Sequence, residues 1–244
     1  MSGDVDLARV AELIADRARS RILLALTGGR ELSASLLAEE AGVSRPTTSA
    51  HLRKLTDGGL IDVRVDGKRR HYRLAGAAVA DVIERLAALA PREPITSLRE
   101  STRAAQLRRA RSCYDHLAGR LGVGIMERML ERGFLTGGDG TFDAERATRD
   151  APASYGHDAQ YELTGSGRDF LDDLGVTLIG GRRPLVRYCV DWTETRHHLA
   201  GQVGRGLRER FLDAGWIEPS GTTRALRVTA TGEDFLRREL GLAI

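Results

Sequence analysis

The sequence has 244 residues, 41% of them hydrophobic, which is enough for one large domain or two modest ones. Its formal net charge is only +3 at pH 7, so composition alone does not indicate a nucleic-acid partner. No apolar run approaches the roughly 18 residues of a membrane span, and the acidic start lacks the apolar core of a secretory signal. Two cysteines are too few for a disulfide framework. We therefore expect a cytoplasmic protein with no membrane partner.

Apolar periodicity in the first ninety residues predicts helices at 7–15 and 18–26 and a shorter helix in SASLLAEEAG. A fourth helix is expected after Ser44, which is a suitable N-cap, with Pro46 in its first turn. The segment LIDVRVDGKRRHYRL then has strand character, and its Asp66-Gly67 pair favours a hairpin turn. Helix, turn, helix and hairpin in this order predict a winged helix-turn-helix.

The fourth helix has the pattern that a recognition helix needs. Leu52 and Leu55 lie three residues apart and face the core, while the other positions are mostly polar and face outward to base edges and phosphates. The hairpin tip adds cations suited to phosphate contacts. The alternative is a winged helix that contacts protein, with a merely solvated tip. The candidate DNA-binding residues are Ser44, Arg45, Thr47, Thr48, Ser49, His51, Arg53, Lys54, Arg64, Lys68, Arg69 and Arg70.

Three segments, IADRARSRILLAL, LAEEAGVSRPTTSAHLRKLTDGGLI and GKRRHYRLA, resemble the ArsR/SmtB family of bacterial winged-helix transcriptional regulators. The resemblance covers residues 7–90. It implies a homodimer built through the first helix and the helix after the wing, at 77–90. It also implies a repressor that leaves its double-stranded operator DNA when an inducer binds. The whole chain resembles a subset of these regulators with a long C-terminal extension that contains CYDHLAG.

The inducer sites that the family uses are missing. Arsenic-type sensors carry a cysteine pair where this chain reads ELSASLLAEE. Zinc-type sensors carry Asp and His ligands on the last dimer helix, where this chain offers Asp81 and Glu84 but no histidine. An effector site, if there is one, is therefore expected in the second half of the chain.

The second half contains an internal repeat. HLAGRLGVGIMERMLERGFL (116–135) aligns without gaps with HLAGQVGRGLRERFLDAGWI (198–217), and YELTGSGRDFL (161–171) aligns with LRVTATGEDFL (226–236). Residues 99–135 are expected to be largely helical, and each repeat to be a degenerate winged helix. The prolines of PREPITSLRE mark a boundary. We expect a mainly α fold with small β-wings (α+β), divided into 1–92, 93–176 and 177–244, the last two being tandem repeats.

The only two cysteines lie near the HLAG motifs. On a helix, Cys113 and His116 would share a face, and Tyr114 and Asp115 would point elsewhere. Two thiols with imidazoles and a carboxylate could bind a transition metal or metalloid tetrahedrally. The cysteines precede their HLAG histidines by different distances, which suggests that they are not equivalent positions of the repeat. The candidate metal or effector residues are Cys113, His116, Cys189, Asp191, His197 and His198.

Other readings of these motifs stay open. His-Leu-Ala-Gly suits close helix packing, and buried cysteine often acts as a small hydrophobe. Nearby aromatic residues would suit an organic ligand, and the thiols would suit a thiol sensor. The repeats could instead recruit a protein partner and serve assembly. An enzyme with Cys113 as nucleophile and His116 as base has no glycine loop or third orienting group beside it, so no enzymatic activity is expected.

Overall fold

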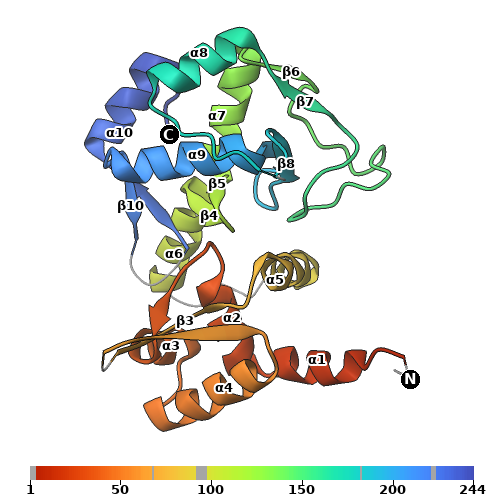
Figure 1. Ribbon diagram of the computed structural model, residues 1–244, viewed down its shortest axis with the longest axis vertical. Coiled ribbons are helices and arrows are strands. Elements are labelled where there is room, and N and C mark those ends of the chain that lie inside the picture. The colour runs from red at the N-terminus through yellow and green to blue at the C-terminus, as the bar shows by residue number, and fades with distance from the viewer. Residues whose placement is uncertain (1–3, 68, 92–97, 182, 221–223) are drawn as a thin grey trace. The chain divides into compact units, whose positions relative to one another are not determined.

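The computed structural model describes residues 4–67, 69–91, 98–181, 183–220 and 224–244 (Figure 1). The chain divides into two compact units, Met1–Ile83 and Glu84–Ile244. Each unit has its own cluster of buried apolar side chains. Within the described residues, no helix is both long and apolar enough to cross a membrane.

The first unit is a winged helix-turn-helix, as predicted. A three-stranded antiparallel sheet of order β1-β3-β2 accompanies its helices. The last helix, α5, crosses from the first unit into the second. The elements are α1 (Leu7–Ala15), α2 (Arg17–Leu26), β1 (Leu32–Ser33), α3 (Ala34–Ala41), α4 (Arg45–Asp57), β2 (Ile61–Asp66), β3 (Arg69–Leu74) and α5 (Ala77–Leu89).

Local sequence explains where α4 begins and how it is anchored. Gly42 ends α3 in the left-handed conformation, at φ +70°, which a residue with a side chain adopts at a cost. Ser44 then caps α4, its hydroxyl accepting a hydrogen bond from the Thr47 amide. Leu52 and Leu55 are buried in the core of the unit, so the opposite face of α4 is left to solvent. The expected N-cap and inward face are both confirmed.

The second unit repeats one order of elements, hairpin, helix, hairpin and helix. In the described part of this unit, each of four sheets is an antiparallel pair of consecutive strands. After α6 (Leu98–Arg109), the first set is β4 (Arg111–Cys113), β5 (His116–Ala118), α7 (Gly119–Glu131), β6 (Leu135–Gly137), β7 (Tyr161–Leu163) and α8 (Gly165–Asp173). The second set is β8 (Arg187–Val190), β9 (His197–Ala200), α9 (Gly201–Asp213), β10 (Ile217–Pro219), β11 (Leu226–Val228) and α10 (Ala230–Phe235), followed by a π-helix, η1 (Leu236–Leu240).

The expectation that residues 99–135 are largely helical is wrong at 111–118, which form the β4–β5 hairpin. Tyr114, in the two-residue turn, has a φ of +55°, which a helix does not allow. All six residues of the two strands are buried. A strand that is buried on both faces has no alternation of polar and apolar residues, so periodicity could not distinguish it from a helix.

The two cysteines occupy equivalent positions, contrary to the expectation from their spacing. Cys113 lies opposite His116 in the β4–β5 hairpin, and Cys189 lies opposite His198 in the β8–β9 hairpin. The second hairpin is longer by one strand pair and has a longer loop, which accounts for the larger sequence distance. The structure therefore places the same Cys–His cross-strand pair in both halves.

The halves of the second unit pack crosswise: α7 contacts β9, α9 contacts β5, and β5 contacts β9. Two glycines allow this approach. A Cβ on Gly122 would lie 2.3 Å from the carbonyl oxygen of Leu117 and 3.5 Å from the His198 Cβ. A Cβ on Gly204 would lie 2.4 Å from the carbonyl oxygen of Leu199 and 3.2 Å from the His116 Cβ. Each half thus makes room for the histidine of the other.

Candidate functional sites

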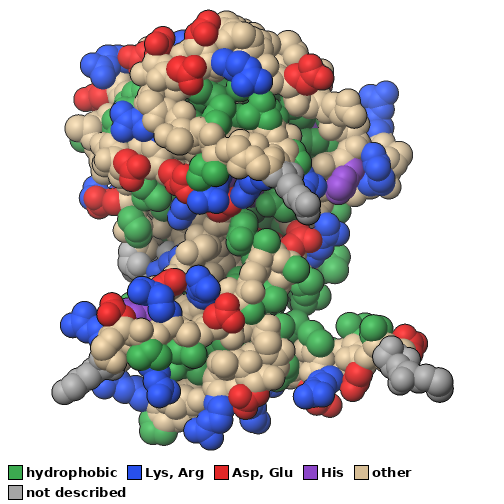
Figure 2. All heavy atoms as spheres, viewed as in Figure 1, with side chains coloured by type: hydrophobic (Ala, Val, Ile, Leu, Met, Phe, Trp, Pro, Cys, Tyr) green, Lys and Arg blue, Asp and Glu red, His purple; other side chains and the backbone are tan. Residues whose placement is uncertain are grey.

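The outer face of α4 is the first candidate site. Arg45, Thr47, Ser49, Arg53 and Lys54 are exposed on it, and Figure 2 shows Lys and Arg side chains gathered where Figure 1 draws α4. An exposed polar helix face, with its apolar residues turned into the core, has the form of a helix that reads base edges in the major groove.

Several of the predicted DNA contacts on α4 and at its N-cap also have intramolecular roles. Thr48 is fully buried, and its hydroxyl donates a hydrogen bond to the Ser44 carbonyl oxygen at 2.9 Å. The Ser44 hydroxyl lies 2.8 Å from that of Thr47 and caps the helix. His51 is half-buried, with Nδ1 at 3.9 Å from an Asp16 carboxylate oxygen. Thr48 therefore positions the helix, and the exposed residues are left for DNA.

The β2–β3 hairpin is the wing of this unit. Arg69 and Arg70 are exposed near its tip. Arg64 is also exposed, but its Nε donates a 2.8 Å hydrogen bond to a Glu31 carboxylate oxygen. Lys68 lies outside the described residues. The wing thus offers at least two exposed arginines for backbone phosphates.

The second candidate site lies between the β4–β5 and β8–β9 hairpins. Ligand atoms of Cys113, His116, Cys189 and His198 all lie within 4.8 Å of one another. None of these four residues is more than 8% exposed. The His116 and His198 rings are 5.2 Å apart between centroids. Asp191 and His197, which were also predicted to belong to the site, are not in this group.

Each of these histidines has a carboxylate beside its Nδ1. Asp191 Oδ2 lies 3.3 Å from His198 Nδ1, and the same carboxylate receives 2.7 Å and 2.8 Å hydrogen bonds from the Gly119 amide and Arg111. Asp115 Oδ1 lies 3.3 Å from His116 Nδ1, and Arg183 Nη2 donates to it at 2.9 Å. The expectation that Asp115 points away from His116 is wrong, because a two-residue turn places it beside that ring.

The charges of the cluster shift the pKa values of its members. Hydrogen bonding to Cys189 and the proximity of His116 hold the pKa of the Cys113 thiol well below its usual value, although burial opposes this. Burial and the neighbouring Cys113 raise the pKa of Cys189. Burial lowers the pKa of His116, but Cys113 and Asp115 outweigh it and raise the pKa to about 9. The pKa values of the two thiols thus shift in opposite directions, and the shift of Cys113 favours its thiolate beside His116.

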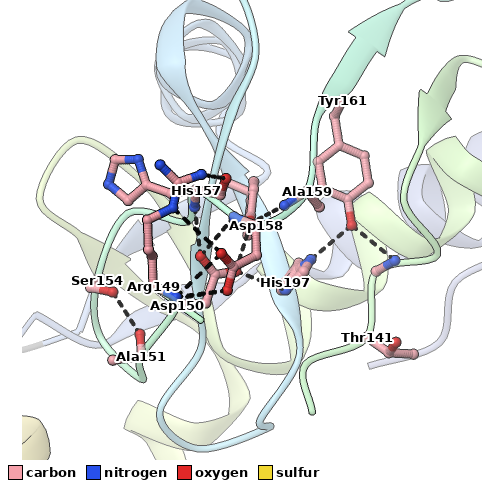
Figure 3. Close-up of polar contacts among 12 residues, drawn as sticks. Thr141, Arg149, Asp150, Ala151, Ser154, His157, Asp158, Ala159, Tyr161 and His197 are labelled. Atoms are coloured by element: carbon pink, nitrogen blue, oxygen red, sulfur yellow. Dashed lines mark hydrogen bonds and ion pairs between the residues drawn. The ribbon is translucent and has the colours of Figure 1, made fainter. Parts of the chain in front are cut away.

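His197 points away from the cluster and belongs to another network. Its Nδ1 lies 2.7 Å from the Tyr161 hydroxyl, as Figure 3 shows. Its ring also packs on that of Tyr188 at 4.2 Å, and burial lowers its pKa to about 4. His197 and His198 are neighbours on one strand, so their side chains leave on opposite faces.

The insert between β6 and β7 is organised by two carboxylates and covers the cluster. Asp158 accepts hydrogen bonds from three successive backbone amides, at 148–150 (Figure 3). Asp150 accepts one from the Tyr188 hydroxyl. Further along the insert, Tyr155 forms a β-bridge with Cys189, and its ring lies 6.1 Å from that of His116. The sequence motifs pointed to the cysteines and histidines, but nothing in the insert marked Tyr155 as their cover.

Comparisons with known proteins agree with the architecture of the first unit. Residues 14–64 match the helix-turn-helix domain family. The chain is 37% identical to the uncharacterized HTH-type transcriptional regulator YdfF of Bacillus subtilis over 242 residues, 98% of this chain and 99% of the relative. It is 36% identical to the arsenical resistance operon repressor of Staphylococcus aureus over 81 residues, 33% of this chain and 77% of that one.

One solved structure that the comparison found is the homodimeric winged helix-turn-helix DNA-binding domain Mb0332 of Mycobacterium bovis. It is 32% identical over 36% of this chain and 89% of that one, with a TM-score of 0.31. The relatedness to YdfF extends over nearly the whole length of both chains. The resemblance to the arsenical repressor is confined to about a third of this chain. The chain therefore belongs to the ArsR-type helix-turn-helix transcriptional regulators, which bind DNA.

Proposed function

We propose that the chain is a homodimeric repressor that places α4 in the major groove of its operator and the β2–β3 wing on the neighbouring phosphates. The observation that carries this proposal is the exposed polar face of α4, with Arg45, Arg53 and Lys54 on it, next in sequence to a wing that exposes Arg69 and Arg70. The similarity to a repressor of an arsenical resistance operon supports the direction of control.

The apolar faces of α1 and α5 support a dimer. Leu7 and Val10 are 74% and 38% exposed on α1, which buries none of its residues. On α5, Val82, Leu86 and Leu89 are 47%, 42% and 83% exposed, and their spacing puts them on one face of the helix. Apolar side chains left in water on two helices are suited to a second copy of the same chain.

We assign the effector or assembly role to the second unit. The described residues of the first unit include neither cysteine, and they offer no group like the buried set that the β4–β5 and β8–β9 hairpins bring together. That set of thiols and imidazoles is the part of the chain that is chemically equipped to bind an effector.

Binding to the promoter DNA of its own gene tests the DNA-binding proposal. Arg45→Ala should relax the preference for operator over random DNA, because a side chain at the start of a recognition helix contacts base edges. Arg69→Ala should weaken binding to both sequences and lower the slope of log affinity against log salt by about 1, because it removes one phosphate contact. Fluorescence anisotropy at several salt concentrations measures both effects.

Arg168→Ala is the matched control, since this exposed arginine lies on α8 of the second unit. It removes the same charge from the chain and should leave both affinities and the salt slope unchanged. An equal loss of affinity in all three variants would mean that only the overall charge matters. Equal affinity of the parent chain for promoter and random DNA would contradict operator recognition.

A further inference from the structure

We propose that Cys113, His116, Cys189 and His198 bind one Zn²⁺ ion, which joins the β4–β5 hairpin to the β8–β9 hairpin. The inference rests on the role proposed for the second unit and assigns its buried thiols and imidazoles to a structural ion that joins the two halves. Metal binding itself does not depend on DNA binding, so either proposal can fail without the other.

The four ligand atoms already lie at nearly the right separations. Zinc bonds of ~2.3 Å to sulfur and ~2.0 Å to nitrogen give a tetrahedron with edges of roughly 3.3 to 3.8 Å. In the structure all four atoms lie within 4.8 Å of one another, so movements of about 1 Å would complete the coordination. Two thiolates and two imidazoles in a tetrahedron are a ligand set typical of structural zinc sites.

The histidines are oriented as metal ligands usually are. The Nε2 atoms of His116 and His198 are both buried and have no hydrogen-bond partner. On the other side of the His116 ring, Nδ1 is hydrogen-bonded to Asp115 Oδ1 at 3.3 Å. His198 Nδ1 also lies 3.3 Å from a carboxylate oxygen, that of Asp191, but without the geometry of a hydrogen bond. A carboxylate at one ring nitrogen sets the tautomer in which the other nitrogen is free to bind a metal.

Neither a disulfide nor apolar packing would satisfy all four buried ligand atoms. A Cys113–Cys189 disulfide would use both sulfurs but would leave the two imidazole Nε2 atoms buried without partners. Apolar packing would leave them unpaired as well, and an unpaired buried polar group destabilises the folded state. A metal ion satisfies all four groups together.

The burial of the site indicates what kind of metal site it is. All four ligands come from the protein, and none is more than 8% exposed. A closed tetrahedral site has no position for a water or a substrate, as in structural zinc sites, whereas a catalytic site keeps one open. Because each half contributes one Cys–His pair, the ion would hold the two halves together.

The first measurement is the zinc content of the full-length chain. The protein is purified without chelator, refolded with Zn²⁺ in excess and then dialysed to remove unbound metal. We expect one zinc ion per chain. Titration of the metal-free protein with Co²⁺ should give the intense ligand-field bands of tetrahedral cobalt and a thiolate-to-metal charge-transfer band. Both cysteines should react with a thiol reagent in the metal-free protein and be protected after zinc is added.

Variants assign the site to its residues. Cys113→Ser, Cys189→Ser and His198→Gln should each lose the stoichiometric zinc. Asp115→Asn keeps all four ligands and should lower the affinity for zinc about 10- to 100-fold, because it removes only the carboxylate behind His116. His157→Gln is the control, because His157 is exposed and lies outside the group. It should keep one zinc ion and the cobalt spectrum of the parent.

The Co²⁺ spectrum and the thiol protection are read on the parent protein, so a variant that fails to fold does not leave the proposal undecided. A parent protein that takes up no zinc and gives an octahedral cobalt spectrum would overturn it. So would a Cys113–Cys189 disulfide that forms in preference to the metal complex when zinc and reductant are both present. Zinc retained by Cys113→Ser and Cys189→Ser together would place the metal elsewhere and overturn it as well.

Discussion

Gly122 and Gly204 show how single residues decide the approach of the two hairpins. They are equivalent positions in the aligned segments of the repeat, each in the first turns of its helix. The side chain that each lacks would occupy space next to the Cβ of the opposite histidine. The close approach of His116 to His198 therefore depends on two missing methyl groups, and a methyl group restored at either position tests that dependence.

Gly204→Ala should destabilise the second unit. The added Cβ would lie 2.4 Å from the Leu199 carbonyl oxygen and 3.2 Å from the His116 Cβ, so backbone or ligand must move. Overpacking of this kind costs typically about 1–3 kcal/mol. For a chain of this size each kcal/mol lowers the melting temperature by about 2–4 °C. Thermal unfolding followed by tryptophan fluorescence measures the change.

Gly165→Ala is the matched control for this substitution. Gly165 begins α8, has no atom within 4 Å of the added Cβ, and does not have a positive φ. Alanine there should be neutral or slightly stabilising, because alanine favours helix more than glycine does. A melting temperature that is unchanged in Gly204→Ala would show that the hairpins do not need this close approach.

The residues of the cluster could be predicted from the sequence only in part. The repeated HLAG motif and the scarcity of cysteine pointed to both cysteines and to three histidines. Both cysteines and two of those histidines, His116 and His198, do lie together in the structure. Asp115 could not be identified, because its position depends on a tight turn at Tyr114 that the assumed helix excluded. The exclusion of His197 required the strand assignment of β9, which puts neighbouring side chains on opposite faces.

At the scale of elements, α1 and α5 each expose apolar side chains to solvent. Leu86→Glu places a charge in the middle of the exposed face of α5, between Val82 and Leu89. A charge in an apolar dimer interface must be desolvated, so the substitution should convert dimers to monomers. It should also reduce operator affinity, because the two half-sites would then be bound by separate chains.

Size-exclusion chromatography with light scattering measures the mass of the Leu86→Glu protein. Ile179→Glu is the matched control, because Ile179 is an exposed apolar residue of similar accessibility, 49%, outside both helices. It should leave the mass at that of the parent. A parent chain that is monomeric at the concentrations that bind DNA would contradict the proposed dimer.

The predictability of the elements differs between the units for a physical reason. The helices of the first unit are amphipathic and carry caps and glycine stops, so periodicity and capping were enough to place α4 and the wing. In the second unit the short strands β4, β5 and β9 are buried throughout. Their sequences show no alternation of polar and apolar residues. The strand register that makes Cys113 equivalent to Cys189 depends on the lengths of the two hairpin loops, which only the folded structure reveals.

At the scale of the whole molecule, the two hydrophobic cores allow the units to unfold separately. The proposed zinc ion lies within the core of the second unit and has no ligand in the first. Both tryptophans of the chain, Trp192 and Trp216, also belong to the second unit, where one lies against Arg111 and the other stacks on Phe235 at 3.6 Å. Tryptophan fluorescence therefore reports the second unit alone, while circular dichroism reports the helices of both.

Removal of zinc should lower the melting temperature of the second unit and leave that of the first unchanged. A ligand that binds only the folded state stabilises it by RT ln(1 + [L]/Kd), or about 4 kcal/mol at a free concentration of 1,000 times Kd. The fluorescence transition should move to lower temperature in the metal-free protein, and only one component of the circular dichroism transition should move with it. In Cys189→Ser the fluorescence transition should no longer respond to zinc. Equal shifts of both components of the circular dichroism transition would mean that the ion stabilises the chain as one cooperative unit. No shift of either component would contradict a structural role for the ion.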